Sequence, residues 1–220
     1  MKRFAYVVLS LSLALLTAGA QSDENVAFQW AFGAITGEEN TFVSISRDTM
    51  LNSGDDIKML VNLQRECFVY LIHSGPSDDI TLLFPYSLEQ FDKDYAVKKN
   101  YYVPLGRRWI TFDKTTGKER FYLLASNERL TDLERLLTGY QSGDAAKKAT
   151  LSKQIASEIR NVKRRFRKFA TLAEKPVTIG GNIRGIGESE DVARRPDVSN
   201  IATLISASNF YGKTFTIDHR

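Results

Sequence analysis

The sequence predicts a mainly β protein: an antiparallel, immunoglobulin-like β-sandwich with a helical insertion near residues 131–172. Two observations lead to this fold class. Between residues 28 and 130, short apolar runs and turn residues alternate about every ten residues, as in antiparallel sandwiches. Helical periodicity begins only after Ser126, and strand-like runs return beyond residue 176. We therefore expect residues 21–220 to form a single domain with one helical insertion.

The predicted strands alternate with polar turns. The run IKMLVNLQ at residues 57–64 alternates apolar and polar side chains, which predicts a strand with one face in water. Residues 67–73 (CFVYLIH) and 80–84 (ITLLF) are apolar on both faces, so we expect a hairpin of two central strands. Its turn, SGPSDD, is rich in turn-forming residues, and Pro85 ends the second strand. Further strands are expected at TFVSIS (41–46), YYVPL (101–105), RRWITFD (107–113), RFYLLAS (120–126), VTIGGNIRGIG (177–187), IATLISAS (201–208) and KTFTIDH (213–219).

Two helices are expected within the insertion. Thr131 and Glu134 have the spacing of a capping box, and Asp144 is a candidate N-cap for a second helix. Further along, apolar residues recur at intervals of three and four, which places them on one stripe of a helix. The stripe predicts that this helix packs on the sandwich through Leu151, Ile155, Ile159, Val162, Phe166 and Phe169.

Residues 1–20 have the pattern of a secretory signal peptide. A basic head, MKR, precedes an uncharged apolar segment, and small residues at Ala18 and Ala20 resemble a cleavage site. The apolar segment is shorter than the ~20 residues that span a bilayer. We therefore expect an exported protein that does not span the membrane, located in the periplasm or outside a bacterial cell. Its mature N-terminus is expected near Gln21, and export argues against a nucleic-acid partner.

Composition and cysteine usage indicate a core held by packing. The chain is 43% hydrophobic and 11% aromatic, which is sufficient for a folded domain. Cys67 is the only cysteine, so the chain cannot form an intrachain disulfide. Because Cys67 lies in the apolar run CFVYL, we expect a buried, unpaired thiol.

No motif indicates an enzyme, a metal site or a cofactor. A G-x-S-x-G nucleophile motif is absent, and we interpret His73 and His219, the only two histidines, as surface residues. Residues 55–56 and 78–79 are each an Asp-Asp pair. These pairs could bind calcium, but a role in forming turns is the simpler interpretation. The run GGNIRGIG lacks the spacing of a nucleotide-binding loop.

Aromatic residues offer one alternative site. Tyr101, Tyr102 and Trp109 flank the sequence VPLGRR and could line a surface on which a sugar stacks. Aromatic residues on strands are usually part of the core, and we favour that interpretation.

The clearest polar feature is the predicted helix at residues 144–172. It carries nine basic residues against Asp144 and Glu158, a net charge of +7 in a chain whose formal net charge is +4. A face of this kind attracts anionic lipids, acidic glycans or an acidic protein, although a solvated outer face explains it as well. The basic residues are Lys147, Lys148, Lys153, Arg160, Lys163, Arg164, Arg165, Arg167 and Lys168, and we select the last five as the candidate partner-binding residues.

Four motifs follow one another in a characteristic order: SGDDIKMLVNLQRECFVYLIH, ITLLFPYS, YYVPL and TGKERFYLLAS. In this order the chain resembles the bacterial family catalogued as domain of unknown function 4384, over about residues 41–130. The resemblance implies a small β-sandwich-like domain of exported or envelope-associated proteins, and it implies no reaction. The residues that carry it are Gly54, Asp55, Phe68, Tyr70, Leu83, Phe84, Pro85, Pro104, Gly117, Glu119 and Ser126.

These observations favour a non-enzymatic module of the bacterial cell envelope that binds a protein or a surface polymer, without cofactor or metal. Two alternatives stay open. The protein could bind a membrane surface or a glycan through the basic helix at 144–172, or it could be a hydrolase whose site has no recognisable motif.

Overall fold

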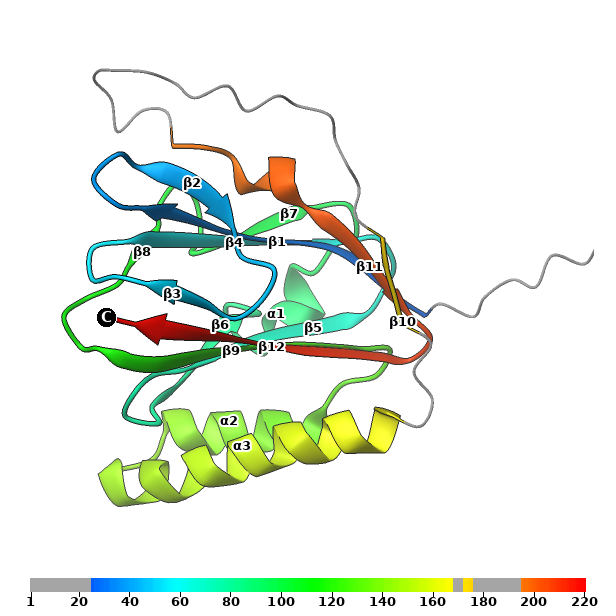
Figure 1. The fold of residues 1–220 in the computed structure, drawn as a ribbon. Helices are drawn as coiled ribbons and strands as arrows, with labels where there is room; N and C mark the ends of the chain where they lie inside the picture. Colours follow the sequence, from blue (N-terminus) through cyan, green and yellow to red (C-terminus); the bar gives the residue numbers. More distant parts are fainter. Residues whose placement is uncertain (1–24, 168–171, 176–194) are drawn as a thin grey trace, which may run out of the picture.

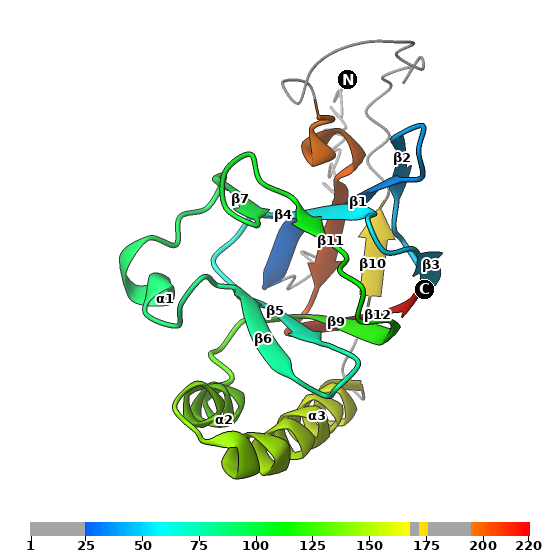
Figure 2. The ribbon, with the colours of Figure 1, turned by 90° about the vertical axis from the view of Figure 1, so that its left-hand side faces the viewer.

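The computed structural model describes residues 25–167, 172–175 and 195–220. Two β-sheets face each other, and a pair of helices covers the outer side of the second sheet (Figures 1 and 2). The mainly β sandwich predicted from the sequence is thereby confirmed. The predicted signal peptide (residues 1–20) and the predicted strand at 177–187 lie outside the described residues. Within the described part of the chain, no helix is both long and apolar enough to cross a bilayer.

The first sheet has the strand order β10-β11-β1-β4-β7, with β1 at its centre. β4 pairs along most of the length of β1, while β11 and β2 share the other edge of β1. β7 and β8 likewise pair with different parts of the edge of β4 that faces away from β1. Its strands are β1 (Val26–Thr36), β2 (Thr41–Ser44), β4 (Asp56–Leu63), β7 (Asn100–Val103), β8 (Ile110–Thr111), β10 (Leu172–Lys175) and β11 (Thr203–Ala207).

The second sheet has the order β3-β12-β9-β5-β6. All of its pairs are antiparallel except β3 and β12, which run parallel. β12 comes from the end of the chain and lies between β3 and β9, so a late strand completes a sheet built mainly from the middle of the sequence. The strands are β3 (Thr49–Leu51), β5 (Phe68–Ser74), β6 (Ile80–Phe84), β9 (Gly117–Ser126) and β12 (Phe210–His219).

The layer between the sheets is the main hydrophobic core. Phe32 of β1 makes edge-to-face contacts with Phe121 of β9 and Phe215 of β12, at ring-centroid distances of 5.2 and 5.6 Å. Such contacts add to the free energy gained by burying large apolar surfaces. The same core contains residues of β1, β4, β5, β9, β11 and β12, so strands from both ends of the chain share it.

The hairpin predicted around SGPSDD is present, but only one of its strands is central. β5 lies between β9 and β6 and is buried on both faces, as expected. β6 is an edge strand in which Thr81 is exposed, so the prediction of a second central strand was wrong. In the turn, Gly75 N–H donates to Asp79 O at 3.0 Å, and Asp78 adopts a positive φ of 59°.

The water-exposed face predicted for β4 is also wrong, because a second layer of chain covers it. Leu60 packs against Val198, which belongs to the short 3₁₀ helix η2 (Val198–Ile201). Lys58 is only 5% exposed, and its ammonium group donates to three carbonyls of the loop after β7. Burial lowers the pKa of Lys58, and the three carbonyls replace the water that it loses.

The described part of the chain also contains three α-helices: α1 (Gln90–Lys93), α2 (Thr131–Gln141) and α3 (Ala145–Arg167). Asp144 caps α3 as predicted, because its Oδ1 accepts from the Lys147 N–H at 2.8 Å. The prediction of a capping box at the start of α2 was wrong. Thr131 lies inside α2, and the Glu134 carboxylate binds Tyr70 and Arg129 instead. The insertion is also shorter than predicted, since Leu172 already belongs to β10.

Cys67 supplies a test of the core. Its side chain is 3% exposed, and burial raises its pKa to about 11, so the unreactive thiol form prevails at neutral pH. We expect iodoacetamide to label native Cys67 slowly and the denatured protein rapidly, as measured by mass spectrometry. A Cys67→Ser variant is the control for nonspecific labelling. Rapid labelling of the native protein would contradict the packing described here.

Candidate anion-binding surface on the helical side

The predicted apolar stripe of α3 packs on the outer face of the second sheet. Ile155, Ile159 and Val162 are buried in a second hydrophobic cluster, together with Tyr70 and Leu124 from the strands. Strand side chains alternate between the two faces of a sheet, so β5 and β9 supply apolar residues to both the inter-sheet core and this cluster. The prediction is confirmed for these three residues of α3 and for Phe166, which packs against the same cluster, while Phe169 lies outside the described residues.

The C-terminal half of α3 lies against β12. Phe166 stacks on Phe210 with a ring-centroid distance of 4.9 Å. The stem of Lys163 passes close to Gly212, where an added Cβ would lie 3.2 Å from its Cγ. Its ammonium group donates to Thr214 Oγ1 at 3.1 Å, and burial lowers its pKa. Lys163 therefore belongs to the contact between α3 and the sheet.

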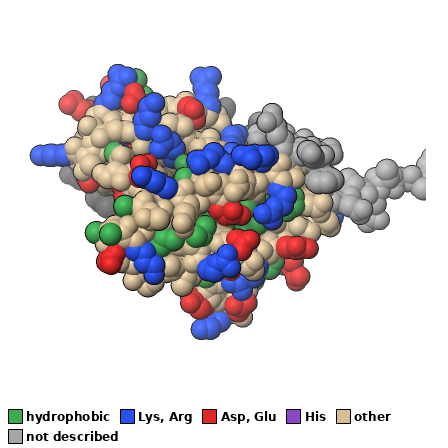
Figure 3. All heavy atoms as spheres, turned by 90° about the horizontal axis from the view of Figure 1, so that it is seen from below, with side chains coloured by type: hydrophobic (Ala, Val, Ile, Leu, Met, Phe, Trp, Pro, Cys, Tyr) green, Lys and Arg blue, Asp and Glu red, His purple; other side chains and the backbone are tan. Residues whose placement is uncertain are grey.

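The other four predicted partner-binding residues occupy different positions. Arg164 and Arg165 are exposed, and among the described residues only Arg165 has an acidic neighbour, with 3.8 Å between its Nη2 and Glu158 Oε1. Arg167 is the last residue of α3, and Lys168 lies outside the described residues. Figure 3 views this side of the molecule and shows many Lys and Arg side chains, with Asp and Glu among them.

A cleft opens beside α3, between the helix and the ends of β5 and β9. Its volume is about 340 Å³, and side chains from both α3 and the sheet line it. Three of the lining residues are cations: Arg120 from β9, and Lys153 and Arg160 from α3. The lining residues are Ser74, Asp78, Ile80, Arg120, Tyr122, Ser152, Lys153, Ala156 and Arg160.

The three cations of this cleft have no partner within the described ranges: none of them forms an ion pair or a hydrogen bond there. Asp78 is the only acidic residue in the lining. A concave site with excess positive charge and hydroxyl groups is suited to an anionic ligand. Lys153 and Arg160 belong to the basic helix predicted from the sequence, whereas Arg120 was not among the predicted candidates. The alternation of Arg120, Tyr122 and Leu124 along β9 was the signal that places Arg120 on the helical face.

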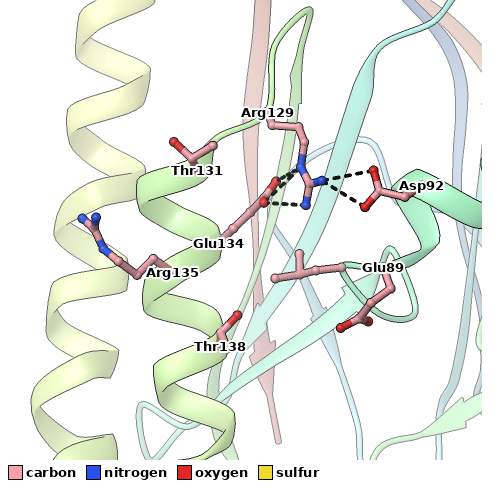
Figure 4. Close-up of a pocket in the computed structure, with 8 residues that line it drawn as sticks. Glu89, Asp92, Arg129, Thr131, Glu134, Arg135 and Thr138 are labelled. Carbon is pink, nitrogen blue, oxygen red and sulfur yellow. Dashed lines mark hydrogen bonds and ion pairs between the residues drawn. The ribbon is translucent and has the colours of Figure 1, made fainter.

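A second hollow, of about 290 Å³, lies between α1 and α2 (Figure 4). There Arg129 points toward two carboxylates, with Nη2 2.8 Å from Glu134 Oε2 and Nη1 3.3 Å from Asp92 Oδ2. Glu134 also accepts a hydrogen bond from the Tyr70 hydroxyl at 2.6 Å, and this hydroxyl accepts from the Leu130 N–H. The arrangement neutralises Arg129 and fastens the start of α2 to β5, so its role is structural.

The interpretation of the histidines as surface residues was wrong for His219, whose side chain is fully buried. Glu119 lies between the two histidines: His73 Nε2 is 2.5 Å from Glu119 Oε2, and His219 Nδ1 is 3.5 Å from Oε1. Because each imidazole approaches a different carboxylate oxygen, the three groups do not converge on one point. No group of three potential metal ligands was found among the described residues.

Ser53 completes a chain of polar groups, since its Oγ lies 3.1 Å from His219 Nε2. A serine, a histidine and a carboxylate in this order resemble the constellation of a hydrolase. However, the Ser53 N–H donates to Arg220 O and the Gly54 N–H to Phe112 O. Neither amide is free to stabilise an oxyanion, so these two groups do not supply the donors that acyl transfer at Ser53 requires.

The remaining candidates have structural partners. Asp55 accepts from the Gly37 and Asn52 N–H groups, which is the turn role expected for it. Tyr101 is buried in the core. Tyr102 and Trp109 pack beside the cations Lys58 and Arg195, respectively, so these aromatic rings do not form a free stacking surface.

The docking of α3 can be tested through Ile159, which is 1% exposed. We expect Ile159→Ala to lower the free energy of unfolding by about 2–5 kcal/mol, as large-to-small core substitutions do. Arg164→Gln on the same helix is the matched control and should change it by less than about 0.5 kcal/mol. Urea denaturation followed by circular dichroism measures both values. Equal stabilities for the two variants would contradict the docking.

Comparison with known proteins agrees with the motifs seen in the sequence. The family model described as "Domain of unknown function (DUF4384)" matches residues 50–129. No curated protein and no solved structure matches the chain. The matched segment contains β3 to β9 but neither β1 nor β12, which pair directly with its strands. Residues 50–129 of this chain are therefore similar to the DUF4384 family, as the order of the sequence motifs indicated.

Proposed function

We propose that this protein is an exported, non-enzymatic module of the bacterial cell envelope that binds an anionic partner through the helical side of its sandwich. The observation that carries the proposal is the set of cations on this side: Arg164 and Arg165 are exposed on α3, and the cations of α3 and β9 around one cleft have no partner among the described residues. The basic head and apolar segment of residues 1–20 support export to the periplasm or the exterior.

The division of labour within α3 supports binding rather than a purely structural role. Its apolar stripe and Lys163 hold the helix on the sheet, while Arg160, Arg164 and Arg165 remain exposed. A cation close to an anionic membrane surface contributes about 1 kcal/mol, and salt screens this contribution within a Debye length. Several such cations on one rigid helix give an affinity that depends strongly on ionic strength.

Export can be tested independently of binding. We expect the mature protein to begin near Gln21 and to accumulate outside the cytoplasm, because residues 1–20 have the composition of a cleaved signal. N-terminal sequencing of the protein from periplasmic and culture fractions measures this. Recovery of a chain that still begins at Met1 from the cytoplasm would contradict export.

Binding can be tested with two double variants of equal charge change. We expect Arg164→Glu/Arg165→Glu to weaken binding in a pulldown from envelope extract and in co-sedimentation with vesicles rich in anionic lipid. The control, Arg107→Glu/Arg108→Glu, changes two exposed arginines on the loop after β7 and should bind like the parent. Thermal denaturation verifies that both variants are folded.

The dependence of binding on salt concentration tests whether the interaction with the partner is electrostatic. Binding by the parent should fall as salt is raised from 50 to about 500 mM, because exposed charges are screened. If the α3 variant and the loop variant bind equally well, the basic surface of α3 is a solvated face and the proposal is wrong.

A further inference from the structure

The cleft beside α3 has cations on two opposing elements. Arg120 projects from β9, while Lys153 and Arg160 come from α3, about two turns apart. Arg120 is directly opposite Ser74 of β5 in the sheet register, and Ser74 is 4% exposed. Paired sheet positions share a face, so both side chains are directed to the helical side. The cleft is therefore a built feature of the helix–sheet contact.

The apolar contact between α3 and the sheet stops at this point. Ile72 and Ile155 are fully buried in the helical cluster, whereas the next residue of β5 on the same face is Ser74. On the same face of β9, the residues that follow one another toward the cleft are Leu124, Tyr122 and Arg120. Polar residues thus replace apolar ones on both strands at the same level of the sheet.

Hydroxyl groups add hydrogen-bonding capacity to the cleft. Burial raises the pKa of Tyr122, although the neighbouring Arg120 and Arg160 lower it in part, so the phenol retains its proton at neutral pH. Neither Tyr122 nor Ser74 uses its hydroxyl in a hydrogen bond with another residue of the described ranges. Ser152 donates to Ala149 O at 3.2 Å, which leaves its oxygen as an acceptor.

We propose that this cleft binds a phosphate group carried by the anionic partner, an inference that rests on the proposed function. Two guanidinium groups can each donate two hydrogen bonds to phosphate oxygens, while lysine adds a point charge. The Ser74 and Tyr122 hydroxyls supply further donors. A cleft of about 340 Å³ lies within the range of small-ligand sites, about 300–1,000 Å³, and is large enough for a phosphate together with part of the group that bears it.

The experiment uses the mature protein and inorganic phosphate as the probe, followed by isothermal titration calorimetry at low and constant ionic strength. We expect saturable binding by the parent. The variants Arg120→Gln and Arg160→Gln should each weaken it about tenfold or more, because hydrogen bonds to a charged group are lost. The matched control Arg107→Gln/Arg108→Gln changes two exposed arginines of the loop after β7, which do not line the cleft, and should retain the affinity of the parent.

A second measurement distinguishes the sources of the phosphate. A soluble hexose phosphate that competes with inorganic phosphate indicates a phosphorylated glycan. Phosphatidic acid vesicles that sediment the protein, and release it when phosphate is added, indicate a lipid headgroup. Either result supports the cleft as a phosphate site.

Two results would overturn the inference: no saturable binding of phosphate by the parent, or equal binding by the parent and both cleft variants. Folding of every variant is checked by thermal denaturation, so loss of binding through unfolding is recognised. Because inorganic phosphate requires no envelope extract, this outcome is distinct from failure of the proposed function, which appears as absence of a salt-sensitive partner in the pulldown.

Discussion

The structure depends on one constraint: the second sheet has two apolar faces, and both must be removed from water. β5 and β9 alternate apolar residues to either side, with Leu71 and Leu123 in the inter-sheet core and Ile72 and Leu124 in the helical cluster. The first sheet covers one face and the α2–α3 pair covers the other (Figure 1). Without the helices, the second face would expose a continuous apolar surface, which folded domains avoid.

This constraint determines where the charges of α3 lie. Only one stripe of the helix contacts the sheet, so its basic residues must lie on the outer side or at the margin of the stripe. Lys163 lies at the margin and binds Thr214, whereas Arg164 and Arg165 lie outside. On the same side of the helix, three residues before Lys163, Arg160 lies in the cleft that the helix and β9 together surround.

Charged side chains elsewhere in the structure have partners within the protein, in contrast to the cations of this cleft. Lys58 is surrounded by three carbonyls, and Arg129 is tied to Glu134 and Asp92. Glu119 has histidines on both of its oxygens. Such pairing is expected because an unpartnered charge away from water is costly. In the cleft, by contrast, Lys153 and Arg160 are exposed and have no such partners in the described structure, so water solvates them and they are accessible to an anion.

The sequence by itself determined the class of fold, the central position of β5, the cap of α3 and its buried stripe. These follow from local periodicity and turn chemistry, which depend on residues close together in the chain. It also indicated the similarity of residues 50–129 to the DUF4384 family. It could not determine that β6 is an edge strand or that η2 covers β4, because both depend on which distant segments pack together. The same is true of the candidate site. Arg120 is 40 residues from Arg160 in the chain, and only the contact between β9 and α3 brings them to one cleft.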